Sequence, residues 1–368
     1  MHASRNAIVI GAGFGGLAAA LRLTARGMQT TLVDRLSGPG GRAVEFVRET
    51  AGHQFRYDAG PTVLTAPILF EELFALFGER LSDHVELLPV KPWYQMRFAD
   101  GTQLNYGGTT AEIQAEIAQF SQVDAASYPA FLEHSRKLFE KGYVELGTQP
   151  FLGWTSMLKA LPAMARLRAD RSVYDVTSRY FSDERVRRSF SIQPLLVGGN
   201  PFNTTSIYSL IHYLERQWGV WFPRGGMAAL VRALVKLGER HGAQFLWNAD
   251  VKRITSQANR ITGIRLADGK QLQADVVIAN ADPGYVISNL LEADPNLALN
   301  EITELLNLDV PTFGLCNYTD RLDIWELIYS DIDYVEGKQK RPNDNIDQDG
   351  FYIDDPIYVA LHHGNLPP

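Results

Sequence analysis

The sequence predicts an α/β protein built on a parallel sheet, and three observations carry that prediction. A glycine-rich turn at residues 11–16 follows a short apolar run and precedes a helical pattern. The next apolar run ends in an acidic residue, Asp34. A second region of βαβ character spans residues 216–285. We therefore expect two separated parts of the chain to complete one domain around an inserted α+β region.

The glycine-rich turn has the spacing G-x-G-x-x-G at Gly11, Gly13 and Gly16. Gly11 permits the tight turn, Gly13 lets the backbone approach a pyrophosphate, and Gly16 lets the helix pack closely on the strand. The pyrophosphate would lie on the free N–H groups at the positive end of that helix. Asp34 would accept hydrogen bonds from ribose hydroxyls. This order of strand, turn, helix and acid predicts a Rossmann-like dinucleotide site.

A second glycine cluster, Gly40-Gly41-Arg42, follows the acidic strand end. By itself it would be interpreted as a surface turn. Beside the first cluster, a second loop without side chains favours a cofactor that is held along an extended channel.

Apolar periodicity and turn residues place the other elements. The Asp100-Gly101 turn predicts a hairpin between residues 93–98 and 103–106. Gly27 and Gly242 are expected to end the first and last helices. Helices are predicted at residues 17–26, 68–76, 111–120 and 227–240, and strands at residues 7–10, 30–33, 244–247, 251–255, 260–266 and 272–278.

Composition narrows the function classes. The 368 residues are 45% hydrophobic, so the chain can bury a large core. A net charge of −7 argues against a nucleic-acid partner. One cysteine, Cys316, excludes a disulfide framework and a cysteine-rich metal site. No apolar run reaches the length of a spanning helix and no signal peptide precedes the first strand, which predicts a cytoplasmic protein.

No metal ion is predicted. The eight histidines show no metal-ligand spacing, and His362-His363 is interpreted as a solvated pair. Residues 345–350 match part of a calcium-binding EF-hand loop, but Pro356 stands where the bidentate Glu is needed. A solvated acidic loop is the preferred interpretation.

Four further stretches occur together with the glycine clusters: residues 57–63 (YDAGPTV), 195–202 (LLVGGNPF), 218–226 (WGVWFPRGG) and 280–282 (NAD). The set resembles the bacterial phytoene desaturases, which belong to a large FAD family with the amine oxidases and glutathione reductase-like flavoproteins. The likeness runs from the N-terminus to about residue 300. It implies a Rossmann-like FAD-binding domain with an inserted α+β domain that faces substrate and membrane.

The resemblance also implies how the chain is divided. Residues 1–110 would be the first part of the FAD-binding domain, and residues 216–290 the second part. Residues 111–215 would form a helical region that meets substrate and membrane. Residues 291–368 would hold the remainder of the substrate domain with an acidic tail.

FAD is the cofactor that the resemblance implies. The second glycine cluster would line the pyrophosphate and ribityl path, and residues 60–62 would lie near the flavin. Val251 would hold adenine through its backbone, Asp282 would lie near the same nucleotide, and Asp34 replaces the longer Glu of many relatives. No catalytic residue is assigned. The implied cofactor-binding residues are Gly11, Gly13, Phe14, Gly16, Asp34, Gly40, Gly41, Arg42, Gly60, Pro61, Thr62, Val251 and Asp282.

The activity that the resemblance implies is stepwise dehydrogenation of phytoene, a hydrophobic C40 polyene, towards lycopene, with hydride transfer to the flavin. Phytoene has no polar group near the reacting carbons. The protein must therefore align a hydrocarbon and exclude water, and a catalytic acid or base is not required. The electrons would pass on to an acceptor such as a quinone or oxygen.

Residues 151–171 combine apolar side chains with Lys159, Arg166, Arg168 and Arg171. An apolar face with basic edges suits an interfacial helix on anionic lipid. The residues alone favour equally a helix that packs on its own domain. Because the implied substrate resides in lipid, we expect peripheral association with a membrane surface.

Two departures from the family matter. Relatives carry a glycine-rich segment near the C-terminus that closes over the flavin, and it is not recognisable here, so we expect the 368-residue chain alone to be inactive or nearly so. Ser156 stands where many relatives have an acidic residue, so a carboxylate role there fails. The alternatives are a later-step desaturase or ketolase, an amine oxidase-like flavoenzyme, and an inactive FAD- or lipid-binding fragment.

Overall fold

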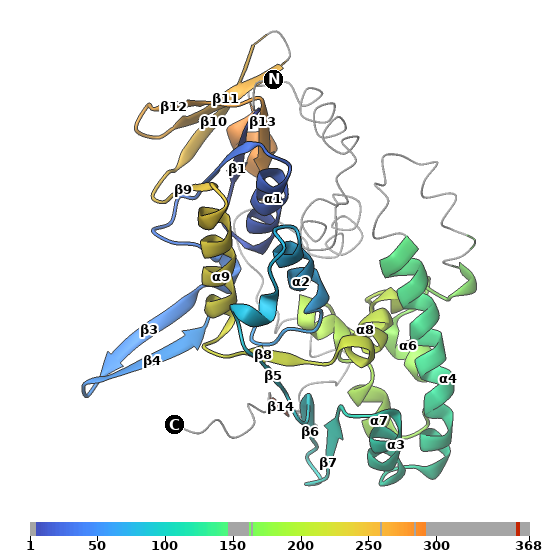
Figure 1. Ribbon diagram of the computed structural model, residues 1–368. Helices are drawn as coiled ribbons and strands as arrows, with labels where there is room; N and C mark the ends of the chain where they lie inside the picture. The colour runs from blue at the N-terminus through green and yellow to red at the C-terminus, as the bar shows by residue number, and fades with distance from the viewer. Residues whose placement is uncertain are drawn as a thin grey trace, which may run out of the picture. The chain divides into compact units, whose positions relative to one another are not determined.

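The computed structural model describes residues 5–145, 162, 165–257, 260–282 and 285–291, and the backbone of residues 358–360. The chain divides into two compact units (Figure 1). Unit 1 comprises Met1–Leu88 and Trp221–Leu322, and unit 2 comprises Pro89–Val220 and Asp323–Pro368.

Unit 1 is built on a four-stranded parallel sheet in the order β13-β1-β2-β9. Strands from both separated parts of the chain share this sheet, which confirms the predicted Rossmann-like nucleotide-binding fold. The glycine turn lies between β1 and α1, as predicted. The elements of unit 1 are β1 (Asn6–Ile10), α1 (Phe14–Ala25), β2 (Gln29–Val33), η1 (Gly41–Ala43), β3 (Glu45–Thr50), β4 (His53–Asp58), α2 (Ile68–Ala75), η2 (Leu81–Asp83), β5 (Leu87–Pro89, which ends at the unit boundary), β8 (Trp221–Pro223), α9 (Met227–Arg240), β9 (Gln244–Leu246), β10 (Val251–Gln257), β11 (Arg260–Leu266), β12 (Gln271–Gln273), β13 (Val276–Ala279) and η6 (Val286–Leu290).

The central strand β1 is buried on both faces because a different layer covers each of them. Ala7 and Val9 belong to a core with α1, α2 and α9, and α1 and α9 lie against each other beside the sheet (Figure 1). Ile8 and Ile10 belong to a second core with β10 and β11. A parallel strand that is covered in this way reads as a continuous apolar run, which explains the sequence of β1.

The predicted strand at residues 272–278 is two strands. β12 completes a three-stranded antiparallel sheet in the order β10-β11-β12, whereas β13 joins the parallel sheet. Ala274 still donates its N–H to the carbonyl of Thr262 at 3.0 Å. Asp275 then ties the chain to the start of β1, because its N–H donates to the Asn6 carbonyl at 2.9 Å and its Oδ2 accepts the Asn6 N–H at 2.8 Å. The apolar run does not reveal this change of sheet.

Unit 2 contains the predicted hairpin and a group of helices. The Asp-Gly turn closes as expected, with the N–H of Phe98 donating to the carbonyl of Thr102 at 3.0 Å. The elements of unit 2 are β6 (Tyr94–Arg97), β7 (Gln103–Tyr106), α3 (Thr110–Ala118), α4 (Gln122–Phe139), η3 (Glu140–Glu145), α6 (Val173–Thr177), α7 (Glu184–Ser189), η4 (Gln193–Val197), η5 (Ser206–Ser209), α8 (Leu210–Trp218) and β14 (Tyr358–Ala360), which pairs with β6.

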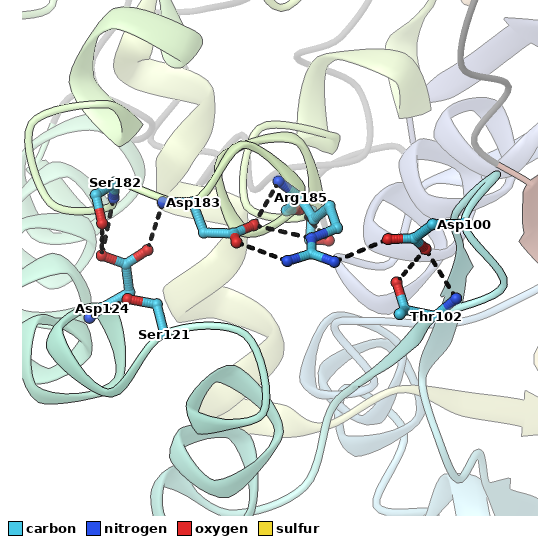
Figure 2. A network of polar contacts seen from close by, with 8 residues as sticks. Asp100, Thr102, Ser121, Asp124, Ser182, Asp183 and Arg185 are labelled. Carbon is cyan, nitrogen blue, oxygen red and sulfur yellow. Dashed lines mark hydrogen bonds and ion pairs between the residues drawn. The ribbon is translucent and has the colours of Figure 1, made fainter.

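A polar network fastens the start of α7 to its neighbours in unit 2 (Figure 2). Asp124, on α4, is 1% exposed. Its Oδ1 accepts the N–H and the hydroxyl of Ser182, and its Oδ2 accepts the N–H of Asp183, each at 2.8 Å. Asp183 caps α7 by accepting the N–H of Arg185 at 2.9 Å, and the Arg185 guanidinium reaches Asp100 in the hairpin turn at 2.8 Å.

Most of residues 151–171, together with Cys316, residues 345–350, Pro356 and His362-His363, lie outside the described residues. Among the helices that the structure describes, none is long and apolar enough to cross a bilayer. The described residues also hold no group of three or more His, Cys, Asp or Glu side chains that suits a metal ion.

Candidate nucleotide-binding site

The three glycines of the first cluster differ in what surrounds them. Gly11 has a φ of +98°, and a Cβ there would lie 2.5 Å from the carbonyl oxygen of Asn280. A Cβ on Gly16 would lie 1.8 Å from the carbonyl oxygen of Gly11. Packing within the protein therefore requires both glycines. Gly13 has a negative φ, and a Cβ there would meet only the Asn280 side chain, at 3.7 Å. The space beside Gly13 is thus open to a ligand.

The N-terminus of α1 faces this space without a cap. Gly13 is its N-cap residue, no side chain caps the helix, and no acidic residue lies in its first turn. The first N–H groups of a helix carry partial positive charge and lack intrahelical acceptors. Phe14 begins the helix, and its ring packs edge-on against Phe70 at 5.2 Å. The backbone at this point therefore has the features of an anion-binding site.

The second glycine cluster lies directly against the first. Gly40 donates its N–H to the carbonyl of Ala12 at 2.8 Å. Gly41 has a φ of +55°, and a Cβ there would lie 3.2 Å from the Cα of Gly13. Arg42 follows with an exposed side chain that makes no ion pair with any described carboxylate. The two clusters therefore form one continuous backbone surface, which Arg42 directly follows in the chain.

Asp34 is buried at the end of β2 and holds the first cluster in place. It is 8% exposed. Its Oδ2 accepts the N–H of Ala12 at 2.7 Å, and its Oδ1 accepts the N–H of Leu36 at 2.8 Å. Each carboxylate oxygen keeps a further lone pair for a hydroxyl donor. Asp34 thus clamps the glycine turn, a role that the local sequence pattern does not reveal.

Residues 60–62 reach the second cluster from the end of β4. A Cβ on Gly60 would lie 2.1 Å from the carbonyl oxygen of Arg42, so the two segments touch through their backbones. Pro61 is exposed and Thr62 is half-buried. Just before them, Asp58 Oδ1 accepts the N–H of Met227 at 3.1 Å, at the start of α9.

Val251 and Asp282 are placed differently from the glycine clusters. Val251 begins β10, and its side chain is 5% exposed within the core on the far face of the sheet, so only its backbone is available to a nucleotide. Asp282 is exposed, and its Oδ1 accepts the N–H of Tyr285 at 2.9 Å. Asn280 is the residue of this strand end that lies against Gly11 and Gly13. Its N–H donates to the carbonyl of Ile10 at 2.8 Å. In the sequence, the motif at residues 280–282 indicated this strand end.

Comparison with known proteins agrees with this geometry. The model of the flavin containing amine oxidoreductases matches residues 14–312. A lycopene-forming phytoene desaturase of Pantoea ananas is 45% identical over 320 residues, which cover 85% of this chain and 64% of that protein. A lycopene-forming phytoene desaturase of Pseudescherichia vulneris is 47% identical over 291 residues, which cover 79% of this chain and 58% of that protein.

The chain thus spans less than two thirds of the length of these curated relatives. Among solved structures, putrescine oxidase bound to putrescine is similar with a TM-score of 0.51 at 14% identity, over 80% of this chain and 62% of that one. At that identity the likeness shows the fold alone. The extent of the family match, together with the paired glycine clusters on a Rossmann-like sheet, establishes that the chain belongs to the flavin-containing amine oxidoreductase family.

Proposed function

We propose that this chain is the FAD-binding and substrate-facing part of a phytoene desaturase, which dehydrogenates phytoene stepwise towards lycopene. The 45–47% identity to two lycopene-forming desaturases is the observation that carries the proposal. Neurosporene-forming relatives from Cereibacter sphaeroides and Rhodobacter capsulatus are 40% identical, so neurosporene is the alternative end product.

FAD is the cofactor of the family, and the features beside Gly13 fit it. The open space there and the uncapped α1 suit the pyrophosphate. Arg42, which follows the second cluster and makes no ion pair with a described carboxylate, would add a positive charge in this region. The remaining lone pairs of Asp34 suit the ribose hydroxyls. Bound FAD would accept the hydride, while the protein orients the hydrocarbon and excludes water.

The division of the chain follows from this assignment as a proposal. Residues 1–110 and 216–290 would bind FAD, and residues 111–215 would meet the polyene and the membrane. Residues 291–368 would complete the substrate domain. The parallel sheet, which takes strands from residues 6–33 and 244–279, supports the first of these assignments.

Peripheral association with the cytoplasmic face of a membrane is part of the proposal, and a basic hollow in unit 2 supports it. A cavity of about 420 Å³ is lined in part by Arg166, Arg168 and Arg179. None of these three arginines makes an ion pair with a described carboxylate. Hydrogen bonds from Ser206 to the carbonyls of Arg168 and Arg171, at 2.8 and 2.7 Å, hold this loop. Converging arginines suit the phosphates of anionic lipids.

The electron acceptor is proposed to be a quinone or oxygen. A membrane location would give the enzyme access to a lipid-dissolved quinone as well as to its hydrocarbon substrate. Product analysis tests the whole proposal: the full-length protein would be incubated with FAD, phytoene in liposomes, and either a quinone or air.

Lycopene or neurosporene as the product supports the proposal, and the acceptor that sustains turnover is identified in the same experiment. Gly13→Val is the matched control, because it should abolish product by excluding FAD. Oxidation of putrescine or another amine without any polyene product would overturn the proposal and favour an amine oxidase.

A further inference from the structure

A buried polar chain runs through unit 2 and plays no part in the nucleotide site. His212 and Glu215 lie on neighbouring turns of α8 and are 0% and 1% exposed. Tyr94 donates its hydroxyl to Glu215 Oε1 at 2.7 Å, and the Tyr106 hydroxyl lies 3.2 Å from Glu215 Oε2. Tyr106 also contacts His212 Nδ1, and the Tyr128 hydroxyl lies 3.1 Å from His212 Nε2. The atoms form one continuous line, Glu215–Tyr106–His212–Tyr128.

Aromatic side chains pack around the middle of this line. The rings of Phe131 and Phe190 pack on the His212 ring with centroids 5.2 and 5.4 Å away. Gln193 donates Nε2–H to the Tyr106 hydroxyl at 3.3 Å. Hydrogens along the line are therefore shared among a small, fixed set of partners.

One further charge faces the line. The Arg216 guanidinium lies over the rings of Tyr106 and Tyr128 at 5.5 and 5.9 Å. In the described part of the chain, the titratable and charged groups that face Glu215 are therefore Tyr94 from β6, Tyr106 from β7, Tyr128 from α4, and His212 and Arg216 from α8.

Counting hydrogens fixes the direction of every link when Glu215 is ionised. The carboxylate accepts from Tyr94 and Tyr106, because it has no hydrogen to give. Because Tyr106 donates its one hydroxyl hydrogen to Glu215, His212 must donate Nδ1–H to the Tyr106 oxygen. His212 Nε2 is left bare and accepts from Tyr128. The four hydrogens of these side chains thus form four hydrogen bonds.

Protonation of Glu215 reverses three of these links. The new hydrogen on Oε2 donates to the Tyr106 oxygen, and the Tyr106 hydrogen turns to His212 Nδ1. His212 must then carry its hydrogen on Nε2 and donate to the Tyr128 oxygen. Five hydrogens are now available for four hydrogen bonds. The fifth is the hydroxyl hydrogen of Tyr128, which has no acceptor within the line and lies at the end opposite Glu215.

Both forms of Glu215 are accessible near neutrality. Burial raises the pKa of Glu215 to about 7, against the lowering effect of the tyrosine hydroxyls and Arg216. Burial, followed by the charge of Arg216, lowers the pKa of His212 well below its usual value. The imidazole is therefore neutral in both arrangements, and only its tautomer differs.

We propose that Glu215, Tyr106, His212 and Tyr128 form a proton relay, in which gain or loss of a proton at Glu215 is transmitted to the Tyr128 hydroxyl by a tautomer switch of His212. In the release direction, Glu215 gives its hydrogen to Tyr106 and Tyr106 gives its own to His212 Nδ1. His212 then gives the Nε2 hydrogen to Tyr128, which loses its original hydrogen. Three hydrogens shift by one link each, and one proton is exchanged with bulk water.

The test is nitrogen-15 NMR of histidine in the purified protein from about pH 5.5 to about pH 8.5. Of eight histidines, His212 is identified by the signal that is lost in His212→Gln. We expect its hydrogen on Nε2 at low pH and on Nδ1 at high pH. The midpoint should coincide with loss of the infrared carbonyl stretch of protonated Glu215.

Two variants separate the relay from mere burial. Glu215→Gln accepts from Tyr94 and donates to Tyr106, so it should fix the Nε2–H tautomer at every pH. Tyr94→Phe is the matched control, because Tyr94 binds Glu215 outside the relay; the switch should persist with its midpoint at higher pH. One unchanging His212 tautomer in the wild type, an imidazolium at low pH, or a switch that survives in Glu215→Gln overturns the proposal.

Discussion

At the scale of single residues, the nucleotide site separates glycines that the fold needs from the glycine that the ligand needs. A side chain on Gly16 would collide with the backbone of Gly11, whereas Gly13 has open space and an ordinary φ. The spacing G-x-G-x-x-G predicts different roles for the three glycines. We therefore expect a substitution at Gly13 to change cofactor binding without disturbing the protein.

Gly13→Val should lose FAD and keep its fold. The added side chain fills the space expected for the pyrophosphate, and we expect FAD affinity to fall by at least about tenfold, or ~1.4 kcal/mol. The measurement is the flavin retained after purification, together with urea unfolding of the apoprotein. Gly38→Ala, in the same region with nothing within 4 Å of its Cβ position, is the control. Retention of FAD equal to wild type would refute the assignment of the site.

Glu215 and His212 contribute to stability with opposite signs. The pKa of Glu215 is raised from 4.5 to about 7 in the folded protein, so the unfolded chain loses this proton first as pH rises. Between these two pH values the free energy of unfolding therefore falls by ~1.4 kcal/mol per pH unit. The pKa of His212 is lowered, so the unfolded chain alone binds that proton at low pH, and stability falls as pH drops below about 6.5. In the wild type the two effects oppose each other between these limits.

Glu215→Gln should leave only the histidine effect. Its free energy of unfolding should rise from about pH 5 to about pH 6.5 and then level off, and the wild type should lose stability relative to it up to about pH 7. Urea unfolding of both proteins at matched pH values measures this difference. Parallel curves for the two proteins would show that Glu215 is ionised throughout.

At the residue scale, the sequence predicted those features whose residues lie close together in the chain. The glycine clusters were visible because a loop without side chains has a known mechanical use, and the motif at residues 280–282 was visible through the family resemblance. The clamp from Asp34 to Ala12 and the line from Glu215 to Tyr128 were not, because the first spans 22 residues and the link from Tyr106 to Glu215 spans 109. Only the fold brings these partners together.

At the scale of elements, periodicity predicted where helices and hairpins lie but not which sheet a strand enters. The hairpin at Asp100-Gly101 formed as expected, since its turn chemistry is local. The run at residues 272–278 divided into β12 and β13, because Asp275 is anchored to the start of β1. That anchor is a tertiary contact and leaves no trace in the local pattern.

The junction of α4 with α7 depends on Asp124, which accepts three hydrogen bonds while buried. Asp124→Asn turns one acceptor into a donor that faces an N–H, and should lower the free energy of unfolding by about 2 kcal/mol. Asp100→Asn makes the same change at a half-exposed ion pair and should cost under about 1 kcal/mol. Equal losses in denaturant unfolding would contradict the network drawn in Figure 2.

At the scale of the whole molecule, the proposed functions fall in different units. The described residues of the proposed cofactor site, namely the glycine clusters, Asp34 and Asn280, all belong to unit 1. The basic hollow and the buried relay belong to unit 2. Binding of FAD and binding to a surface should therefore respond to different substitutions.

Replacing Arg166, Arg168 and Arg179 by Gln should weaken binding to anionic vesicles. Each basic side chain near such a surface contributes about 1 kcal/mol, so the three together should reduce vesicle affinity by about a hundredfold. Sedimentation with phosphatidylserine vesicles measures the change, and phosphatidylcholine vesicles are the uncharged comparison. Arg22→Gln, a change to an arginine of unit 1 that pairs with Glu72, controls for the loss of one positive charge outside the hollow. Undiminished sedimentation of the triple variant would mean that the hollow does not meet the membrane.

The pairing of β1 with β13 has a consequence for how the protein is made. Asn6 bonds to Asp275, a partner 269 residues further along the chain. At synthesis rates of about 5–20 residues per second, the ribosome needs roughly 13–54 seconds to supply it. Through that interval the buried strand β1 lacks one neighbour and the covering layer of β10 and β11. A nascent chain that is slow to emerge would thus expose Ile8 and Ile10 to aggregation, and chaperone binding during translation should centre on this N-terminal strand.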